Sequence, residues 1–283
     1  MKQMSRKTLT MASLAAAGAL SLSSFTVQAA APDAAGARGA PGAPGAPGAP
    51  GARGAAPGAP AAPAGPAAGP APGTNNPAKM SFFVTSAAPG GGDLGGIAGA
   101  DAQCTTLARA AGSPASKTWH AYLSLAPMGN QKQVDARDRI GKGPWFNIKG
   151  VEIAGSVDEL HSENPKMSKA TNLTEKGDIN TGRGDAVNTH DALTGSNAMG
   201  RLAAPEVNAP RGNEPPTPMP PNMTCNNWTS NDQNLVTMQG HIDRSGFVPA
   251  ATSWNTAHPS RGCSATGIAS TGSKGQFYCF AIN

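Results

Sequence analysis

The stretch that most constrains the fold is residues 82–124, where a short apolar strand, a glycine-rich turn, a cysteine-bearing helix and an aromatic strand follow in order. The two strands are predicted at 82–85 and 118–123. Between them, the apolar period over 101–111 puts Cys104 on the buried face of a helix, which a glycine ends. With the strands and helix of this stretch, we expect an α+β domain.

The same globular composition continues over residues 79–283, whose high glycine and asparagine content predicts a loop-rich domain. Two shorter helices are predicted at 131–140 and 156–161, and the second begins with a Ser-x-x-Glu capping box. The further strand candidates are residues 145–148, 151–154, 224–229 and 277–282. Residues 203–222 hold seven prolines and no apolar period, and we expect a loop or insertion there.

Residues 1–29 have the pattern of a secretory signal peptide. Basic residues precede a mostly apolar, uncharged run at 14–22, and small residues lead up to a cleavage point after Ala29. The run is short for a membrane span, with an uncleaved anchor as the alternative. We therefore expect an exported protein that is secreted, held at the cell surface or kept in the periplasm, with no membrane span after cleavage.

The basic balance of the chain comes largely from this leader. The whole sequence has 22 Lys and Arg against 17 Asp and Glu, a formal net charge of +5. Residues 1–29 contain three of the basic and none of the acidic residues, so 19 against 17 remain and the net charge falls to +2. Nucleic-acid binding needs a clustered basic face, and this balance argues against it.

Residues 30–78 consist almost entirely of alanine, proline and glycine. Glycine occupies every third position from Gly36 to Gly54, as in the collagen triple helix, where only glycine fits at the crowded axis. The period then breaks at Pro57. Two interpretations stay open: a short triple helix that would make the protein a homotrimer, or an extended, semi-rigid Pro-Ala-Gly stalk.

The sequence contains an even number of cysteines behind an export signal, which predicts disulfides. The four are Cys104, Cys225, Cys263 and Cys279. No Cys-x-x-Cys or Cys-x-x-His pair suits structural zinc. Four cysteines allow three pairings, and their spacing does not choose among them.

Several sequence blocks surround these cysteines in a set order. They read DLGGIAGADAQCTTLARAAG and KTWHAYLS, then PWFNIKGVEI, LTGSNAMGR, TCNNWTS and FYCFAIN. Over most of residues 81–283 they resemble an endostatin-like module of the C-type lectin fold, and the opening block is also similar to bacterial exported domains of unknown function. The resemblance implies a C-type lectin-like, disulfide-linked domain behind a collagen-like stalk, with nested disulfides that pair Cys104 with Cys279 and Cys225 with Cys263.

The chain departs from the endostatin pattern in two respects. It has no histidine before His120, in the region where that family carries its zinc site, and it lacks the clustered arginines. The resemblance therefore implies neither zinc nor heparin binding for this chain.

The polar loop 175–191 is the first candidate binding site, because many C-type lectin folds carry a calcium-binding loop at the matching place. Oxygen ligands for calcium are offered by Glu175, Asp178, Asp185, Asn188 and Asp191. The alternative is a solvated loop held by Asx turns. No cofactor other than calcium is predicted.

Two further elements are candidate ligand contacts. Arg183-Gly184-Asp185 is an integrin-type tripeptide in a turn-prone setting, although such tripeptides also arise by chance. Trp254 and Asn255 partly match a Trp-Asn-Asp element of the lectin fold, and Trp254 stands in a polar loop. The other tryptophans are expected in the core: Trp119, Trp145 and Trp228.

The histidines are the last candidates. A metal or acid–base site would have to be built from His190-Asp191, His241-x-Asp243 and His258. No His-Glu-x-x-His, Gly-x-Ser-x-Gly or spare cysteine nucleophile accompanies them. Separate surface or hydrogen-bonded histidines are the favoured interpretation, and no catalytic residue is predicted.

These patterns together favour a non-enzymatic binding or adhesion module, a C-type lectin-like head on a collagen-like stalk, that binds an extracellular glycan or matrix protein. Two rival functions stay open. One is an assembly protein whose head trimerises a collagenous tail, and the other is a hydrolase built on the histidines and aspartates.

Overall fold

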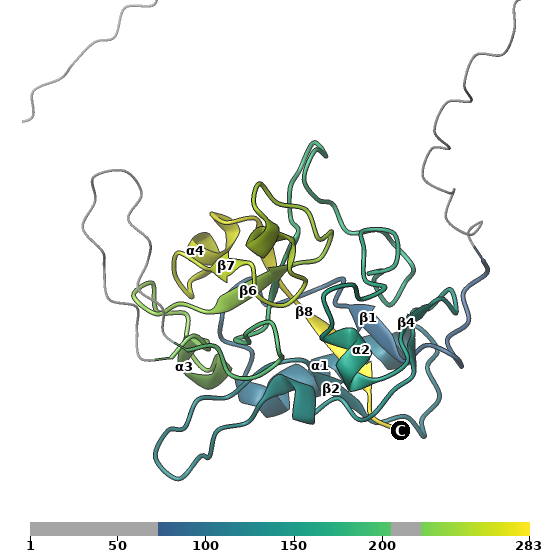
Figure 1. The fold of residues 1–283 in the computed structure, drawn as a ribbon. Helices are drawn as coiled ribbons and strands as arrows, with labels where there is room; N and C mark the ends of the chain where they lie inside the picture. Colours follow the sequence, from purple (N-terminus) through teal and green to yellow (C-terminus); the bar gives the residue numbers. More distant parts are fainter. Residues whose placement is uncertain (1–72, 205–221) are drawn as a thin grey trace, which may run out of the picture. The chain divides into compact units, whose positions relative to one another are not determined.

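A nine-residue strand, β8 (Ser273–Ala281), runs through the main sheet of this computed structural model (Figure 1). Its C-terminal half lies antiparallel between β1 (Phe82–Val84) and β2 (Trp119–Ala121). Its N-terminal half pairs in parallel with β5 (Asp191–Leu193). Every residue of β8 except Lys274 is buried, so this strand needs cover on both of its faces.

The sheet continues from β5 through two shorter strands. β5 pairs antiparallel with β6 (Met238–His241), which in turn pairs antiparallel with β7 (His258–Pro259). A separate antiparallel pair is formed by β3 (Trp145–Phe146) and β4 (Glu152–Ala154). The sheet order β1-β8-β5-β6-β7 therefore brings strands together that are far apart in the sequence.

The structure describes residues 73–204 and 222–283. The predicted signal peptide (1–29), nearly all of the predicted stalk (30–78) and most of the proline-rich segment 203–222 lie outside the described residues. Within the described part of the chain, no helix has the length and apolarity that crossing a membrane requires.

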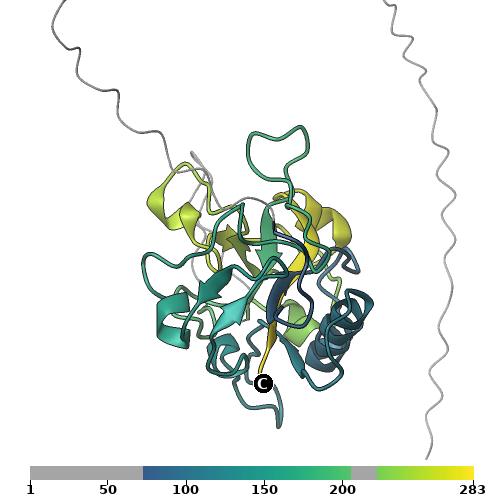
Figure 2. The ribbon, with the colours of Figure 1, turned by 90° about the vertical axis from the view of Figure 1, so that its right-hand side faces the viewer.

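One long helix and several short ones accompany the strands. The long helix is α1 (Gly96–Ala110), which packs against β2 and β8 and is seen at the side of the sheet in Figure 2. The short ones are η1 (Ala136–Asp138), α2 (Val157–Leu160), α3 (Cys225–Trp228), η2 (Pro249–Thr252) and α4 (Ala265–Ala269).

Two hydrophobic cores lie on the two faces of β8, because successive side chains of a strand point in opposite directions. Phe277, Cys279 and Ala281 pack into the core that includes Cys104 and Ala108 of α1. The β8 side chains on the other face, Tyr278 and Phe280, belong to a second core. They pack there with aromatic rings from other elements: Phe82, Tyr122, Trp145 and Trp254. The domain is thus α+β, as the sequence predicts.

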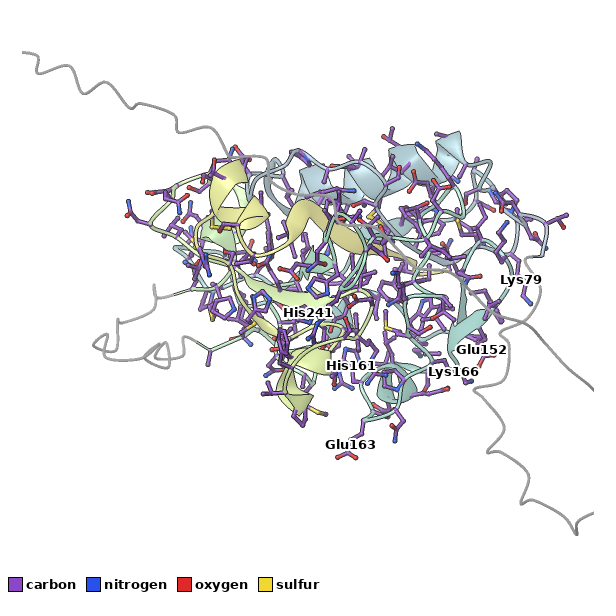
Figure 3. All side chains as sticks on the ribbon, turned by 90° about the horizontal axis from the view of Figure 1, so that it is seen from above. Lys79, Glu152, His161, Glu163, Lys166 and His241 are labelled. Carbon is purple, nitrogen blue, oxygen red and sulfur yellow. A yellow bond between two sulfur atoms is a disulfide. The ribbon has the colours of Figure 1, made fainter. Side chains whose placement is uncertain are left out.

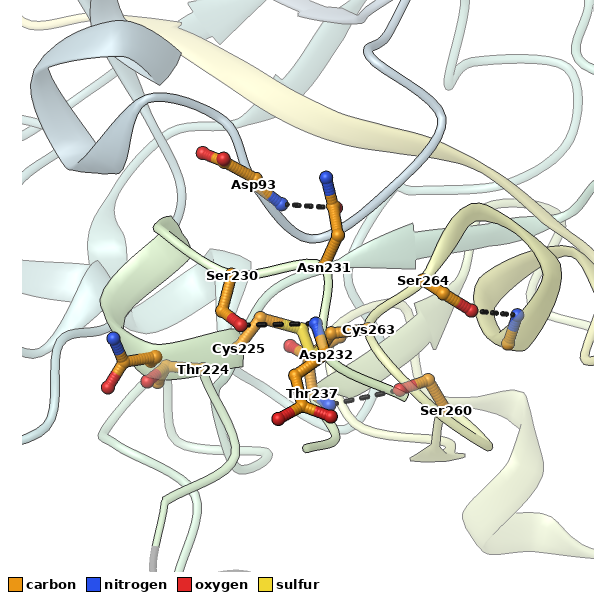
Figure 4. The surroundings of a disulfide bond; sticks show 12 residues. Asp93, Thr224, Cys225, Ser230, Asn231, Asp232, Thr237, Ser260, Cys263 and Ser264 are labelled. Carbon is orange, nitrogen blue, oxygen red and sulfur yellow. Dashed lines mark hydrogen bonds between the residues drawn. A yellow bond between two sulfur atoms is a disulfide. The ribbon is translucent and has the colours of Figure 1, made fainter. Parts of the chain in front are cut away.

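All four cysteines form disulfides, in the pairing that the resemblance implied. Cys104 of α1 is bonded to Cys279 of β8, and 175 positions separate them in the sequence. Cys225 is bonded to Cys263, 38 positions away. Figure 4 shows the second disulfide, close to which the Asn231 side chain accepts a hydrogen bond from the Asp93 backbone N–H at 2.9 Å.

Two of the predicted helices are confirmed. The one predicted at 101–111 begins five residues earlier, at Gly96. The glycines of that first turn lower its helix propensity, but the tertiary structure overrides this because Leu94, just before the helix, is buried in the core. The predicted cap at Ser156 is present, since Ser156 Oγ accepts from the Glu159 backbone N–H at 3.1 Å. The Glu159 side chain accepts from the N–H of Gly155, one residue before the cap, at 2.7 Å, and not from that of Ser156 as in a strict capping box.

The helix predicted at 131–140 is wrong. Only the short η1 forms there, because the backbone of Val134 exchanges two hydrogen bonds with Leu125 at 2.8 and 3.1 Å. Ala136 also forms a tertiary contact, because its backbone N–H donates to Ser124 Oγ. The three-residue spacing of Val134, Arg137 and Ile140, which predicts a helix, therefore occurs here without one.

The strand predicted at 224–229 is wrong as well. Four residues in a row from Cys225 to Trp228 have positive φ values of 49°, 57°, 55° and 66°, so this segment is a left-handed turn. Side chains stabilise it: Asn227 donates to and accepts from the backbone of Ala126 at 2.9 and 2.8 Å, and Trp228 Nε1 donates to the Ser124 carbonyl at 2.9 Å. Asparagine tolerates this conformation as a single residue, but four such residues in a row are unusual, so the composition of the segment does not predict the turn.

Candidate functional site

Three neighbouring strands bring a group of histidines and aspartates together. His190 and Asp191 stand at the start of β5, His241 ends β6 and His258 begins β7. Asp191 is the register partner of His241, and His258 is the register partner of Gln239, two positions before His241. Because side chains alternate along a strand, Asp191, His241 and His258 share one face of the sheet.

The carboxylate of Asp191 is the centre of this histidine cluster. Its Oδ1 lies 3.3 Å from His190 Nε2 and 3.4 Å from His241 Nε2, and its Oδ2 lies 3.6 Å from His258 Nε2. The Asp191 side chain is fully buried, and neither oxygen has a hydrogen-bond partner among the described residues. The nearby hydroxyl of Thr271 has two other acceptors within reach, Gln239 Oε1 and the Ile268 carbonyl, each at 2.9 Å, and it can donate its one hydrogen to only one acceptor at a time.

In His190, His241 and His258, the ring nitrogen that points away from Asp191 is Nδ1, and each Nδ1 lies beside a hydrogen-bond acceptor. Nδ1 of His190 lies 2.9 Å from Asp243 Oδ1, that of His241 lies 2.7 Å from the Ser245 carbonyl, and that of His258 lies 3.1 Å from the Pro259 carbonyl. A carbonyl oxygen only accepts, so Nδ1 carries the hydrogen in His241 and His258. In that tautomer Nε2 carries a lone pair and no hydrogen, and Nε2 is the ring atom that faces Asp191.

Burial shifts the protonation of the cluster. It raises the pKa of the Asp191 carboxyl to about 6, while His258 and His190 pull that pKa down. Burial lowers the pKa of His241 to about 4, so this ring is neutral at neutral pH. For Asp243, burial alone would raise the pKa, but hydrogen bonds from His190, the Arg183 N–H and Ser245 outweigh it and hold the pKa far below its usual value.

Asp243 is held close to a neighbouring loop by a glycine. A Cβ on Gly182 would lie 2.3 Å from Asp243 Oδ2, so only glycine fits at this point. The next residue, Arg183, donates its backbone N–H to Asp243 Oδ2 at 2.8 Å. Asp243 therefore fixes the ring of His190 from behind and is itself fixed by the loop around Arg183.

A pocket of about 490 Å³ opens beside the cluster. It is lined by Arg183, Asn188, His190, His241, Ser245, Gly246, Phe247, Val248, Ala251 and His258. Phe247 is 89% exposed, and the Arg183 guanidinium stacks 3.4 Å over its ring. Figure 3 shows His241 set inside the domain, whereas the Glu163 side chain points away from it.

Two sets of side chains in this region have metal-ligand atoms within 4.8 Å of one another: Asp191, His241 and His258, and His190, His241 and Asp243. The oxygens of Asp243 already accept hydrogen bonds from His190, Arg183 and Ser245. Asp191 has no such partners, so it is the carboxylate better suited to bind an ion.

The residues predicted to bind calcium do not meet at one point. Asp185 pairs with Lys169 Nζ at 2.5 Å, and the buried Glu175 accepts hydrogen bonds from Ser86. Asp178 and Asn188 are exposed, and Asn188 lines the pocket beside the histidine cluster. Among the described carboxylates, those of 175, 178, 185 and 191 do not form a group with ligand atoms within 4.8 Å.

The other candidate ligand contacts are engaged within the domain. Trp254 is 3% exposed and donates its Nε1–H to the Leu160 carbonyl at 3.1 Å, so it is part of a core and not an exposed platform. The Asn255 amide donates to the Tyr122 hydroxyl at 3.0 Å. In the Arg-Gly-Asp tripeptide, the Asp185 carboxylate is bound to Lys169 and to the Gly182 N–H. The three tryptophans expected in the core are buried: Trp119, Trp145 and Trp228.

The sequence therefore identifies the residues of the histidine cluster as candidates, but it does not predict that they lie close together. The favoured interpretation was separate histidines, and the structure gathers three of the five in the chain around one carboxylate. The signal that would have revealed the cluster is the pairing of β5, β6 and β7, and these short strands were not predicted.

No protein-family model and no curated protein matches this chain.

Proposed function

We propose that this protein is an exported binding module whose recognition site is the pocket beside the histidine cluster. Two disulfides in the described residues are typical of proteins that work in an oxidising compartment. The endostatin-like resemblance, the signal-peptide pattern and the collagen-like stalk point the same way. A glycan or a matrix protein outside the cell is the partner class that this setting favours.

The observation that carries the proposal is the composition of the pocket. It combines a cation (Arg183), the polar edges of three histidines and an almost fully exposed aromatic ring (Phe247) in one concave site. Convergent polar groups beside apolar side chains are the usual makeup of a ligand site. The Phe247 ring contacts the Arg183 guanidinium but is otherwise open to solvent, and a ligand that covers it would gain from its burial.

A non-enzymatic role fits the position of the acidic groups. Asp191 has a pKa of about 6, which suits a general base, but it is fully buried and does not line the pocket. A hydrolase remains the rival function, and it requires a group in contact with the substrate. The histidines are the groups that would have to fill that role.

The test is a binding screen of the full chain against a glycan array and a panel of matrix proteins. Phe247→Ala should abolish or greatly weaken capture of any ligand found, since it removes the exposed side of the pocket. The matched control is Ile179→Ala, because Ile179 is also exposed (59%) but does not line this pocket. Equal binding by both variants would show that recognition lies elsewhere, and turnover of a bound substrate would favour the hydrolase.

A further inference from the structure

We propose that Asp191, His241 and His258 bind one divalent transition-metal ion of the zinc class at the floor of this pocket, with the ring of His190 stacked beside that of His241. The inference concerns the same site but is independent of the ligand: the ion can bind whether or not the pocket recognises a glycan or a protein.

The first argument is the buried carboxylate of Asp191. A carboxylate taken out of water needs hydrogen-bond donors or a cation, because its charge is otherwise left without compensation. Asp191 is fully buried and both of its oxygens lack a hydrogen-bond partner. The Nε2 atom of His241, which faces it, is also buried and unpartnered among the described residues. One cation between these atoms would satisfy all of them.

The second argument is the spacing of the ligand atoms. The Asp191 oxygens lie 3.4 Å from His241 Nε2 and 3.6 Å from His258 Nε2, and neither contact forms a hydrogen bond. Ligand atoms of these three residues all lie within 4.8 Å of one another. Ligands about 2.0–2.1 Å from a tetrahedral zinc ion lie about 3.3–3.4 Å from one another, so modest shifts would bring the three side chains to bonding distance of one ion.

The third argument is the set of acceptors behind the rings. Histidines that bind metals through one nitrogen almost always donate the other N–H to a carboxylate or a backbone carbonyl. All three Nδ1 atoms have such an acceptor, namely Asp243, the Ser245 carbonyl and the Pro259 carbonyl. These contacts orient the rings and leave the Nε2 atoms of His241 and His258 on the side of Asp191.

The kind of ion follows from the ligand chemistry. Imidazole nitrogens with one carboxylate suit zinc and neighbouring transition metals, whereas calcium and magnesium require a shell of oxygens. Two imidazoles and one carboxylate leave a divalent ion with one net positive charge and a fourth position open to water or a ligand. His258 is 30% exposed and lines the pocket, so an ion can enter from that side and would be reachable by a ligand.

The competing way to neutralise Asp191 is a protonated histidine. All three rings lie at ion-pair distance from the carboxylate, so each is a potential source of that proton. A bound ion and a protonated histidine would each compensate the charge of Asp191, but only the first requires a metal that can be detected.

The experiment is a titration of zinc into the full chain, stripped with a chelator, followed by calorimetry and elemental analysis. We expect one zinc per chain, and His258→Ala should weaken binding by at least about tenfold. His258 is the most exposed of the three ligand side chains, so its loss should disturb the fold least. The control is His120→Ala, a half-buried histidine outside the cluster, which should bind zinc like the wild type.

A second readout needs no variant. Cobalt bound to the wild-type chain should show the visible spectrum of a tetrahedral nitrogen and oxygen site, without a sulfur band because all four cysteines are in disulfides. Absence of stoichiometric zinc binding by the wild type, or equal affinity in the His258 variant, would overturn the proposal. If the protein binds zinc but captures no glycan or matrix protein in the screen, the metal site would be supported and the proposed binding function would be refuted.

Discussion

Asp191 and His241 are register partners in the antiparallel pair β5–β6, and the carboxylate Oδ1 of one lies 3.4 Å from Nε2 of the other. Directly opposed positions of an antiparallel pair are the closest side-chain neighbours in a sheet. An apolar pair would be the simplest choice at such a buried position. The presence of a carboxylate and an imidazole there, without a hydrogen bond between them, marks this end of the sheet as the place with a role beyond packing.

Removal of either disulfide should destabilise the domain. The double variant Cys104→Ala, Cys279→Ala opens a loop of 175 residues and Cys225→Ala, Cys263→Ala one of 38. The chain-entropy model assigns about 5 and about 4 kcal/mol to closing these loops. Denaturant unfolding of both variants beside the wild type measures the losses. An unchanged midpoint for the first variant would show that α1 is held to β8 by packing alone.

Stability should fall on acidification because of His161. Burial lowers the pKa of His161 to about 4 in the folded protein, while the unfolded chain keeps the ordinary value near 6.5. Between these two values the unfolded state binds more protons, so the free energy of unfolding decreases as the pH falls from about 6.5 to about 4. The expected contribution is about 2–3 kcal/mol.

The variant His161→Gln isolates this contribution. Its free energy of unfolding should change less than that of the wild type between pH 7 and pH 4.5, measured by urea denaturation. Parallel pH profiles for the two proteins would contradict the assignment to His161.

The left-handed turn should depend on Asn227 far more than on Asn226. Asn227→Ala removes two hydrogen bonds to the backbone of Ala126 and should cost about 2–3 kcal/mol. Asn226 also has a positive φ, of 57°, but its side chain bonds only to the exposed Thr229, so Asn226→Gly should be neutral or stabilise by up to about 1 kcal/mol. Thermal unfolding of the two variants tests the difference, and equal losses would refute it.

Calcium should leave the stability of the domain unchanged. The carboxylates of loop 175–191 do not converge, and Asp185 is already paired with Lys169. An ion that binds only the folded state raises the melting temperature with its concentration. We expect the same melting temperature in millimolar calcium and in chelator. A rise with calcium that Asp185→Asn abolishes would restore the calcium interpretation of this loop.

Replacement of Trp254 by alanine should destabilise the domain strongly, whereas the same replacement of Phe247 should hardly change its stability. Trp254→Ala empties a buried site and removes the hydrogen bond to Leu160, so it should cost about 3–5 kcal/mol. Phe247→Ala changes a side chain that is 89% exposed and should alter stability by no more than about 0.5 kcal/mol. Chemical denaturation measures both. A stable Trp254→Ala variant would mean that this indole is available to a ligand after all.

Local chemistry determined the parts of this domain that the sequence predicts well. The apolar face around Cys104 predicts a helix, and the cap at Ser156 acts through groups only three residues apart. The even cysteine count in a chain with an export-signal pattern predicted disulfides. Features of this kind depend on neighbours in the sequence, so they can be predicted without knowledge of the fold.

The tertiary structure decided what depends on distant neighbours. The turn at Cys225–Trp228 is left-handed because Asn227 and Trp228 bond to the backbone of residues 124–126, about a hundred positions away in the chain. The meeting of His190, His241 and His258 depends on the pairing of three strands only two to four residues long. Such short strands carry almost no periodic signal of their own, and burial in the complete sheet is what makes them form.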